Sequence, residues 1–181
     1  CGLGVCDDTL KIVFSLIENS TTPLVLDADA LNCVAKQPEI LLKKKAPIII
    51  TPHPGEMSRL TGLATPLVNA ERERVALDFA QKYGVVTVLK GAGTVIASPN
   101  GKVLVNPTGN SGMATGGSGD VLAGMTASIL AQGASAFSSA AAAVYLHGLA
   151  GDIAAEKYGK ISMLPTDLIN CIPLAYKRCG F

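Results

Sequence analysis

The amino-acid sequence predicts a three-layer α/β/α fold built on a mostly parallel sheet with one β-hairpin. Three short apolar runs, at residues 23–28, 48–51 and 85–90, lack polar alternation, as expected for parallel strands covered on both faces. Helical patterns lie between these runs, so we expect repeated β-α-β units with right-handed crossovers. The composition agrees, because 49% of the residues are hydrophobic, glycine is abundant and tryptophan is absent.

Two helices are expected in the first half of the chain. Residues 7–19 carry apolar side chains at helical spacing, and Asp7 or Asp8 can cap the amino end of this helix. Residues 69–83 place alanine and aromatic side chains on one face, which predicts a second helix.

The pattern changes in the second half. Segments 94–98 and 102–106 flank an Asn-Gly pair, which is a strong hairpin signal. From residue 119 onward the chain is expected to be mostly helical, over residues 119–132, 137–157 and 165–177. No repeat or linker divides the sequence, so we expect one domain over residues 1–181.

Charge and cysteine content exclude several classes of protein. A formal net charge of +1 over 181 residues gives no electrostatic reason to expect nucleic acid or a membrane surface as a partner. No apolar run reaches the roughly 20 residues that span a bilayer. Five cysteines without a CxxC pair argue against a disulfide framework and a zinc site. We therefore expect a cytoplasmic protein with reduced thiols, and neither nucleic acid nor a membrane as its partner.

Polar or glycine-rich segments follow each of the three predicted parallel strands. These segments are Asp27-Ala28-Asp29, the run from Thr51 to Glu56, and the run from Lys90 to Thr94. In open α/β sheets, ligands bind beyond the carboxyl ends of the strands. The three segments are therefore expected to converge on one edge of the sheet, where a binding site would lie.

A dense glycine run at residues 108–120 carries the strongest local signal. It ends at Asp120 and leads directly into an apolar stretch that predicts a helix. Glycines allow several backbone N–H groups to face one point, and the positive end of the helix faces that point as well. This combination predicts an anion hole suited to a phosphoryl group.

Asp120 places a negative charge beside this anion hole. A carboxylate there is useful if it accepts a proton from a hydroxyl group that attacks phosphorus. The alternative is an ordinary acidic residue stabilised by the helix dipole. The run contains no Walker A lysine motif, no dinucleotide fingerprint and no complete nucleophile elbow.

Four motifs in order resemble one branch of the ribokinase-like kinases. They are residues 27–32 (DADALN), 51–56 (TPHPGE), 90–94 (KGAGT) and 109–120 (GNSGMATGGSGD), the last ending in a GxGD signature. Together they resemble the ADP/ATP-dependent NAD(P)H-hydrate dehydratases, the carboxy-terminal domain of YjeF-type proteins. The resemblance covers essentially the whole chain and implies a ribokinase-like fold.

The resemblance also implies a reaction, its cofactors and its partners. The substrate would be NAD(P)H that has gained water across C5–C6 of its nicotinamide ring. The enzyme would phosphorylate the C6 hydroxyl group from ADP or ATP, with Mg²⁺, and phosphate would then leave. The family precedent is a homotetramer. The His-Pro-Gly-Glu stretch ending at Glu56 favours ADP, although the sequence alone leaves ADP and ATP open.

Site residues follow from the same resemblance. Asp120 would be the catalytic base and contact the substrate, together with His53, Gly2 and Gly4. The nucleotide would be bound by Lys90, Gly91, Ala92, Gly93, Thr94, Gly117, Ser118 and Gly119. Glu56 matches the acid of an NxxE motif in related sugar kinases that organises Mg²⁺ and phosphate, but His53 stands at the position of its Asn.

Each of these assignments has a structural alternative. Lys90 can be a solvated lysine in a turn, His53 a structural histidine, and Glu56 a helix-capping acid. At least one of Asp29 and Asn32 is expected to cap the next helix. Another histidine, at position 147 in a predicted buried helix, is expected to be a packing residue rather than a ligand.

The amino end of the sequence lies within the resemblance. Gly2-Leu3-Gly4 resembles the end of a Gly-Pro-Gly-Leu-Gly turn that lines the substrate site in the family, with Cys1 where proline usually stands. The family domain has considerably more sequence before this turn. We therefore expect the domain of this chain to be incomplete at its amino end.

Two other functions remain open from the sequence. The first is a ribokinase-like kinase that phosphorylates a vitamin precursor or sugar and stops at that product. The second is a non-catalytic nucleotide-binding fragment. A product assay separates the first from the dehydratase, and nucleotide binding without turnover would indicate the second.

Overall fold

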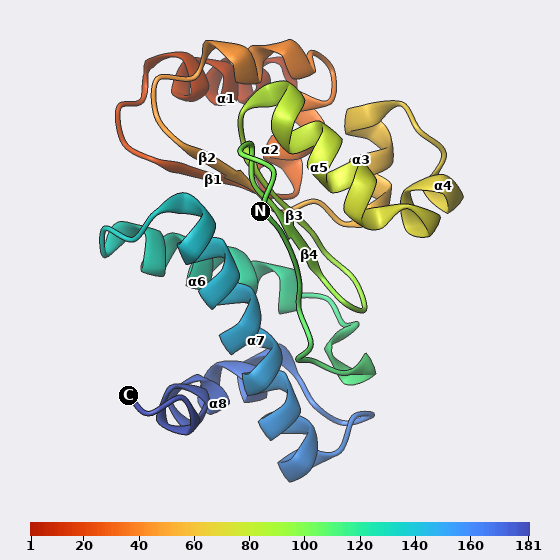
Figure 1. Ribbon diagram of the computed structural model, residues 1–181, viewed down its shortest axis with the longest axis vertical. Coiled ribbons are helices and arrows are strands. Elements are labelled where there is room, and N and C mark those ends of the chain that lie inside the picture. The colour runs from red at the N-terminus through yellow and green to blue at the C-terminus, as the bar shows by residue number, and fades with distance from the viewer.

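Five strands form a single mixed sheet in the order β1-β2-β3-β4-β5 (Figure 1). The computed structural model describes residues 1–181. Adjacent strands are parallel from β1 to β3, and β4 and β5 add an antiparallel hairpin next to β3. The strands are β1 (Leu24–Leu26), β2 (Ile48–Ile50), β3 (Val86–Leu89), β4 (Val95–Ala97) and β5 (Val103–Val105). The predicted strands and hairpin are confirmed.

Helices cover both faces of this sheet. Before the hairpin come α1 (Asp7–Asn19), α2 (Asp29–Val34), a 3-10 helix (Pro38–Lys43), α3 (Pro54–Thr61), α4 (Thr65–Ala70) and α5 (Arg72–Tyr83). After it come a 3-10 turn (Ser111–Met113), α6 (Ser118–Ala131), α7 (Ala136–Tyr158) and α8 (Pro165–Arg178). The first group gathers on one side of the sheet, and α6, α7 and α8 lie on the other (Figure 1).

Alternation along the strands supplies each face with its own hydrophobic core. Ile48 and Ile50 belong to the core under α1, α2, α3 and α5, whereas Ile49 between them belongs to the core under α6, α7 and α8. All three are fully buried, because successive strand residues point to opposite faces and both faces are covered. The three-layer α/β/α architecture is thus confirmed.

Two local predictions are wrong. The helix expected over residues 69–83 is two helices, because Glu71 has a non-helical backbone (φ −125°, ψ 43°) and separates α4 from α5. Helix α1 is preceded by Cys6 as its N-cap residue, so Asp7 and Asp8 lie in the first turn instead of capping it. They still favour the helix there, since acidic side chains interact well with its positive end.

The long helix α7 is buried through most of its length and packs against α6 and α8. Two of its glycines also allow the segment between β5 and α6 to lie close to α7, because a Cβ atom added at Gly148 would collide with Thr108 and one at Gly151 with Met113. None of the helices combines the length and apolar character that a membrane crossing requires. All five cysteines are free thiols.

Candidate functional site

The three strand ends meet at one edge of the sheet, where a buried ion cluster joins them. Lys90, which follows β3, places its Nζ atom 2.7 Å from Oδ1 of Asp27 and 3.8 Å from Oε2 of Glu56. Its side chain is 19% exposed, and each acidic side chain is 6% exposed. The backbone N–H of Lys90 also donates to the Pro52 carbonyl. The alternative that Lys90 is a solvated lysine is therefore wrong.

Asp120 lies beside this cluster and is exposed. One of its carboxylate oxygens, a carboxylate oxygen of Asp27 and the Cys1 thiol all lie within 4.8 Å of one another. A Cβ atom added at Gly119 would lie 3.5 Å from Nζ of Lys90 and 4.0 Å from Oδ2 of Asp27. The amino end of α6 therefore abuts the ion cluster, with the Asp120 carboxylate accessible to solvent.

Unpartnered backbone N–H groups surround Asp120. Gly117 adopts a left-handed conformation (φ 96°) as the N-cap residue of α6, and no side chain caps the helix. The N–H groups of Gly117, Gly119 and Asp120 have no hydrogen-bond partner within the chain. The N–H of Ser118 differs, because it donates to the Thr115 carbonyl at 3.3 Å. Free donors at a helix amino end form a site for an anion.

A buried histidine lies behind the first turn of α6. Nε2 of His147, on α7, is 2.9 Å from the Ser118 carbonyl oxygen. Burial lowers the pKa of His147 to about 4, so the ring is neutral at neutral pH. This agrees with the expectation of a packing residue whose hydrogen bond is satisfied, and it adds a contact with the glycine run.

His53 and Glu56 form a reciprocal cap at the start of α3. Nδ1 of His53 accepts from the N–H groups of Gly55 (3.0 Å) and Glu56 (3.3 Å), and Oε2 of Glu56 accepts from the His53 N–H at 2.8 Å. The capping alternative for Glu56 is thus confirmed. The His53 side chain remains half exposed, so it is accessible at the edge of the sheet.

The segment after β1 differs from its prediction. Oδ2 of Asp29 accepts from the N–H of Gly4 at 2.9 Å, and Oδ1 of Asn32 accepts from Nε of Arg59 at 2.9 Å. Neither side chain caps α2, whose N-cap residue is Ala28. Ala28 has a positive φ of 50°, which is unfavourable for a residue with a side chain. Residues with such backbone conformations are found most often at functional sites.

The turn at the amino end is thereby brought to the same edge of the sheet. Gly2 and Gly4 are exposed and have φ values of 72° and 73°. The hydrogen bond from Gly4 to Asp29 attaches this turn to the end of β1. The structure therefore places the amino-terminal glycines near the segment that contains Asp27.

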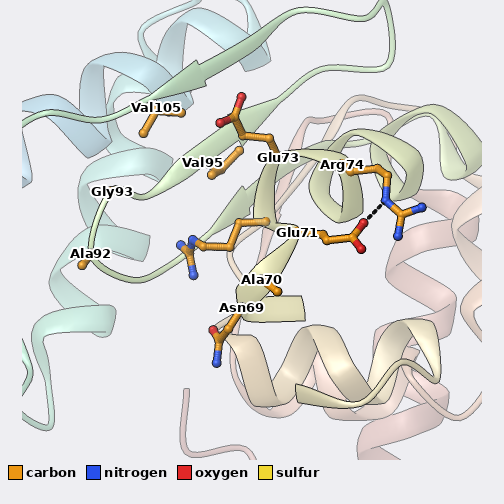
Figure 2. Close-up of a pocket in the computed structure, with 10 residues that line it drawn as sticks. Asn69, Ala70, Glu71, Glu73, Arg74, Ala92, Gly93, Val95 and Val105 are labelled. Carbon is orange, nitrogen blue, oxygen red and sulfur yellow. Dashed lines mark ion pairs between the residues drawn. The ribbon is translucent and has the colours of Figure 1, made fainter. Parts of the chain in front are cut away.

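The loop from Lys90 to Thr94 borders a cleft of about 440 Å³. Figure 2 shows Ala92 and Gly93 on one side of this cleft and Asn69 and Ala70 on the other. Its remaining lining residues are Glu71, Arg72, Glu73, Arg74, Val95 and Val105. Asp120 is not among the residues that line this cleft.

Arg72, which no sequence pattern had indicated, supports this loop. Its Nη2 donates to the Leu89 carbonyl at 2.8 Å, and its Nε is buried without a hydrogen-bond partner. Burial lowers the pKa of Arg72 below its ordinary value. Added Cβ atoms at Gly91 would collide with the guanidinium group. The only sequence signal was a charged residue at the first position of a helix, which is common on protein surfaces.

The sheet order, the glycine-rich turn before α6 and the acidic residue in its first helical turn define a ribokinase-like α/β protein. A solved structure from Enterococcus faecalis, described as a ribokinase-like superfamily protein, has a TM-score of 0.83 at 31% identity. That match covers 98% of this chain and 61% of the other.

The family model for NAD(P)H-hydrate dehydratase matches residues 1–174, and the chain belongs to that family. It is 44% identical to a bifunctional NAD(P)H-hydrate repair enzyme of Thermofilum pendens over 97% of this chain and 34% of that protein. It also resembles the ADP/ATP-dependent NAD(P)H-hydrate dehydratase of Bacillus subtilis, co-crystallised with ATP and Mg²⁺ (TM-score 0.89, 35% identity). That match covers 98% of this chain and 62% of the other.

The chain thus spans about a third of the length of the Thermofilum pendens relative and less than two thirds of the Bacillus subtilis structure. These matches agree with the dehydratase interpretation of the four motifs and not with a kinase for a sugar or vitamin precursor. The expectations of a ribokinase-like fold and of the family are confirmed.

Proposed function

We propose that this chain carries the catalytic domain of a nucleotide-dependent NAD(P)H-hydrate dehydratase, a carbon–oxygen lyase. The observation that carries the proposal is the exposed Asp120 carboxylate in the first turn of α6, next to the free N–H of Gly119. A base and an anion hole at one point are what phosphorylation of an alcohol requires.

Phosphoryl transfer is the first step of the proposed reaction. Asp120 accepts the proton of the C6 hydroxyl group, and the hydroxyl oxygen bonds to the terminal phosphorus of the nucleotide. The bond from that phosphorus to the bridging oxygen breaks, which releases AMP from ADP or ADP from ATP. The N–H groups of Gly117 and Gly119, which have no partner within the chain, would stabilise the charge on the transferred group.

Elimination is the second step. The C6–O bond breaks, and phosphate leaves with the electron pair while the ring nitrogen stabilises the electron-poor carbon. A proton then leaves C5 and the C5–C6 double bond is restored. Conversion of a hydroxyl group into a phosphate ester is useful because hydroxide is a poor leaving group and phosphate is a good one.

The remaining assigned residues would hold the two substrates. His53 has a half-exposed side chain, and the turn containing Gly2 and Gly4 is attached at the end of β1, so both are available to the hydrated nicotinamide. The loop from Lys90 to Thr94 would take the nucleotide through its backbone. The ammonium group of Lys90 is paired with acids, which favours a positioning role for its side chain.

Mg²⁺ fits this site as an ion held mainly by phosphate and water. Glu56 is buried, accepts from the His53 N–H and faces Lys90, which favours a contact with Mg²⁺ through water over direct ligation. A carboxylate oxygen of the buried Asp27 and one of the exposed Asp120 lie within 4.8 Å of each other and are the other oxygen atoms at this site. When bound, Mg²⁺ would neutralise charge on the nucleotide phosphates.

We also propose a homotetramer in the cytoplasm, where NAD(P)H is used and thiols stay reduced. An apolar groove of about 370 Å³ between α6 and α8, lined by Met125, Ile169, Ile172 and Tyr176 among others, supports burial of this face in an assembly. Light scattering checks the subunit number: a monomer at working concentration would contradict the tetramer and leave the catalytic proposal intact.

The catalytic proposal is tested with the protein in its full natural length. Hydrated NADH is incubated with Mg²⁺ and either ADP or ATP, and the return of NADH absorbance is followed together with nucleotide products. We expect NADH, phosphate and AMP or ADP in equal amounts. A stable phosphate ester without NADH would indicate a kinase, and nucleotide binding without any product would indicate a non-catalytic module.

A further inference from the structure

His147 stands where it can control the direction of one backbone N–H group. It is 8% exposed, in the middle of α7, and its Nε2 lies 2.9 Å from the carbonyl oxygen of Ser118, the first residue of α6. Because a carbonyl oxygen only accepts hydrogen bonds, Nε2 carries the ring proton. The side chain therefore donates to the backbone of the glycine run.

The acceptor of this bond belongs to the same peptide unit as the N–H of Gly119. The chain contains no cis peptide bond, so the Ser118 C=O and the Gly119 N–H point in opposite directions in one plane. A donor that holds the carbonyl on the α7 side thereby directs the N–H away from α7. Gly119 lies against Lys90 and Asp27, so this N–H belongs to the edge that contains Asp120.

We propose that His147 is a positioning residue for the anion hole: its hydrogen bond to the Ser118 carbonyl orients and polarises the Gly119 N–H that receives the transferred phosphoryl group. This rests on the proposed function, because the N–H needs a phosphoryl group to bind. A fixed donor stabilises the transition state best, since no reorganisation is needed when charge develops.

The state of the ring suits this task. Burial lowers the pKa of His147 to about 4, so at neutral pH the ring is uncharged and has only one N–H, which it gives to Ser118. Lys90 is the charged group that acts on the ring, and its charge also favours the neutral form. The single N–H of the neutral ring is therefore used for the hydrogen bond to the Ser118 carbonyl.

Three variants separate positioning from packing. His147→Met removes the donor and keeps a buried apolar side chain, whereas His147→Gln keeps an N–H donor near the place of Nε2. Thr126→Val is the matched control, because Thr126 is fully buried on α6, the helix that begins at Ser118, and donates to the Leu122 carbonyl at 2.8 Å. It removes a buried donor without reaching the glycine run.

The readouts are turnover, affinity for ADP, ATP and AMP by calorimetry, and the amide NMR shift of Gly119. We expect His147→Met to lower kcat about 10-fold, less than the roughly 100-fold or more that follows direct loss of an anion-hole donor. It should move the Gly119 amide signal. His147→Gln should restore kcat to within about 3-fold, and Thr126→Val should leave kcat unchanged at a similar loss of stability.

Equal kcat values for His147→Met and Thr126→Val, or an unmoved Gly119 signal, would overturn the proposal. If His147→Met does not fold, the shorter His147→Asn, whose amide does not reach Ser118, replaces it with the same expectations. Failure of the proposed function is recognised separately, because the unaltered protein would then neither bind nucleotide nor restore NADH. The Gly119 signal still tests the orientation in that case.

Discussion

Two groups of polar atoms share one edge of the sheet and differ in how they are satisfied. Lys90, Asp27 and Glu56 form a buried cluster in which each charge faces its opposite. The first turn of α6, a few ångströms away, has an exposed acid at Asp120 and N–H groups without partners at Gly119 and beside it. We call Lys90, Asp27 and Glu56 the closed group, because their charges are paired within the fold, and the first turn of α6 the open group, because its polar atoms remain available to a ligand.

The difference indicates which atoms hold the structure and which are left for a ligand. Charges buried together must be paired, because an uncompensated buried charge is strongly destabilising. Free N–H groups at a helix end carry no such cost while water reaches them. We therefore expect changes in the closed group to affect folding first, and changes in the open group to affect catalysis first.

Among changes that leave Asp120 in place, removal of one N–H from the first turn of α6 should have the largest effect. Gly119→Pro deletes the donor, and proline is tolerated in the first turn of a helix, where no N–H is needed for the helix itself. We expect turnover to fall about 100- to 1,000-fold. Steady-state kinetics of NADH recovery measures this.

Gly119→Ala is the matched control for this variant. It keeps the N–H, and the added Cβ atom meets Lys90 and Asp27 only at ordinary contact distances of 3.5 and 4.0 Å. Its turnover should stay within about 3-fold of the unaltered protein, because the anion-hole donor is retained. Equal losses in both variants would contradict a role for the N–H and indicate steric damage.

Breaking the closed group should act on stability. Lys90→Met leaves two buried carboxylates without their cation, and we expect a loss of about 3–5 kcal/mol in the free energy of unfolding, measured with urea. A second change, Asp27→Asn, should restore part of it, because fewer unpaired charges remain.

Lys11→Met serves as the exposed control. Its partner is Asp8 on the surface of α1, with both side chains largely exposed, so the cost should be about 0–1 kcal/mol. Equal small losses for Lys90→Met and Lys11→Met would contradict the view that the cluster at the strand ends holds the fold.

The buried histidine behind α6 predicts a pH dependence of stability. Burial lowers the pKa of His147 from 6.5 to about 4, so the unfolded chain binds a proton before the folded one does. The contribution of neutral His147 to the free energy of unfolding is complete above about pH 6.5 and is lost as the pH falls towards 4. It amounts to about 3 kcal/mol at most.

Urea unfolding between pH 7 and pH 4 measures this contribution as the difference between the unaltered protein and His147→Gln. Acidic residues titrate in both proteins, so their contributions to the free energy of unfolding cancel in the difference. If the free energy of unfolding fell equally with pH in both proteins, His147 would not be a buried neutral imidazole.

The smallest predicted effect concerns the cap of α3. Glu56→Gln weakens the bond to the His53 N–H and should cost about 1 kcal/mol. Asp167→Asn, which weakens the same kind of bond from the Leu164 N–H at the start of α8, should cost a similar amount. Because Glu56 is proposed to contact Mg²⁺ through water, the Mg²⁺ concentration for half-maximal turnover should rise about 10-fold in Glu56→Gln, and an unchanged value would contradict that contact.

The sequence alone predicted what depends on periodicity and on the general geometry of α/β sheets. Apolar runs gave the strands, and because parallel strands end on one edge, the positions of Asp27, His53 and Lys90 together were predictable. The glycine run likewise predicted the start of α6 with Asp120 at its amino end, because glycine and an acidic residue are typical there.

Long-range pairings were beyond sequence reasoning. Lys90 donates to Asp27, 63 residues earlier, and the Gly4 N–H donates to Asp29. No local sequence pattern predicts these partners. The same holds for Arg72, whose hydrogen bond to Leu89 depends on how α5 packs behind the loop. The break at Glu71 was missed because helical periodicity continues through it in the sequence.

The central claim is that Asp120 serves the chemistry and not the fold, and Asp120→Asn tests it most directly. The variant is isosteric and changes an exposed side chain. With saturating ADP, Mg²⁺ and hydrated NADH, a single-turnover experiment should show NADH formation slowed about 100- to 10,000-fold, with nucleotide affinity and thermal stability nearly unchanged. NADH formation at the normal rate, or loss of nucleotide binding and stability along with it, would contradict the claim.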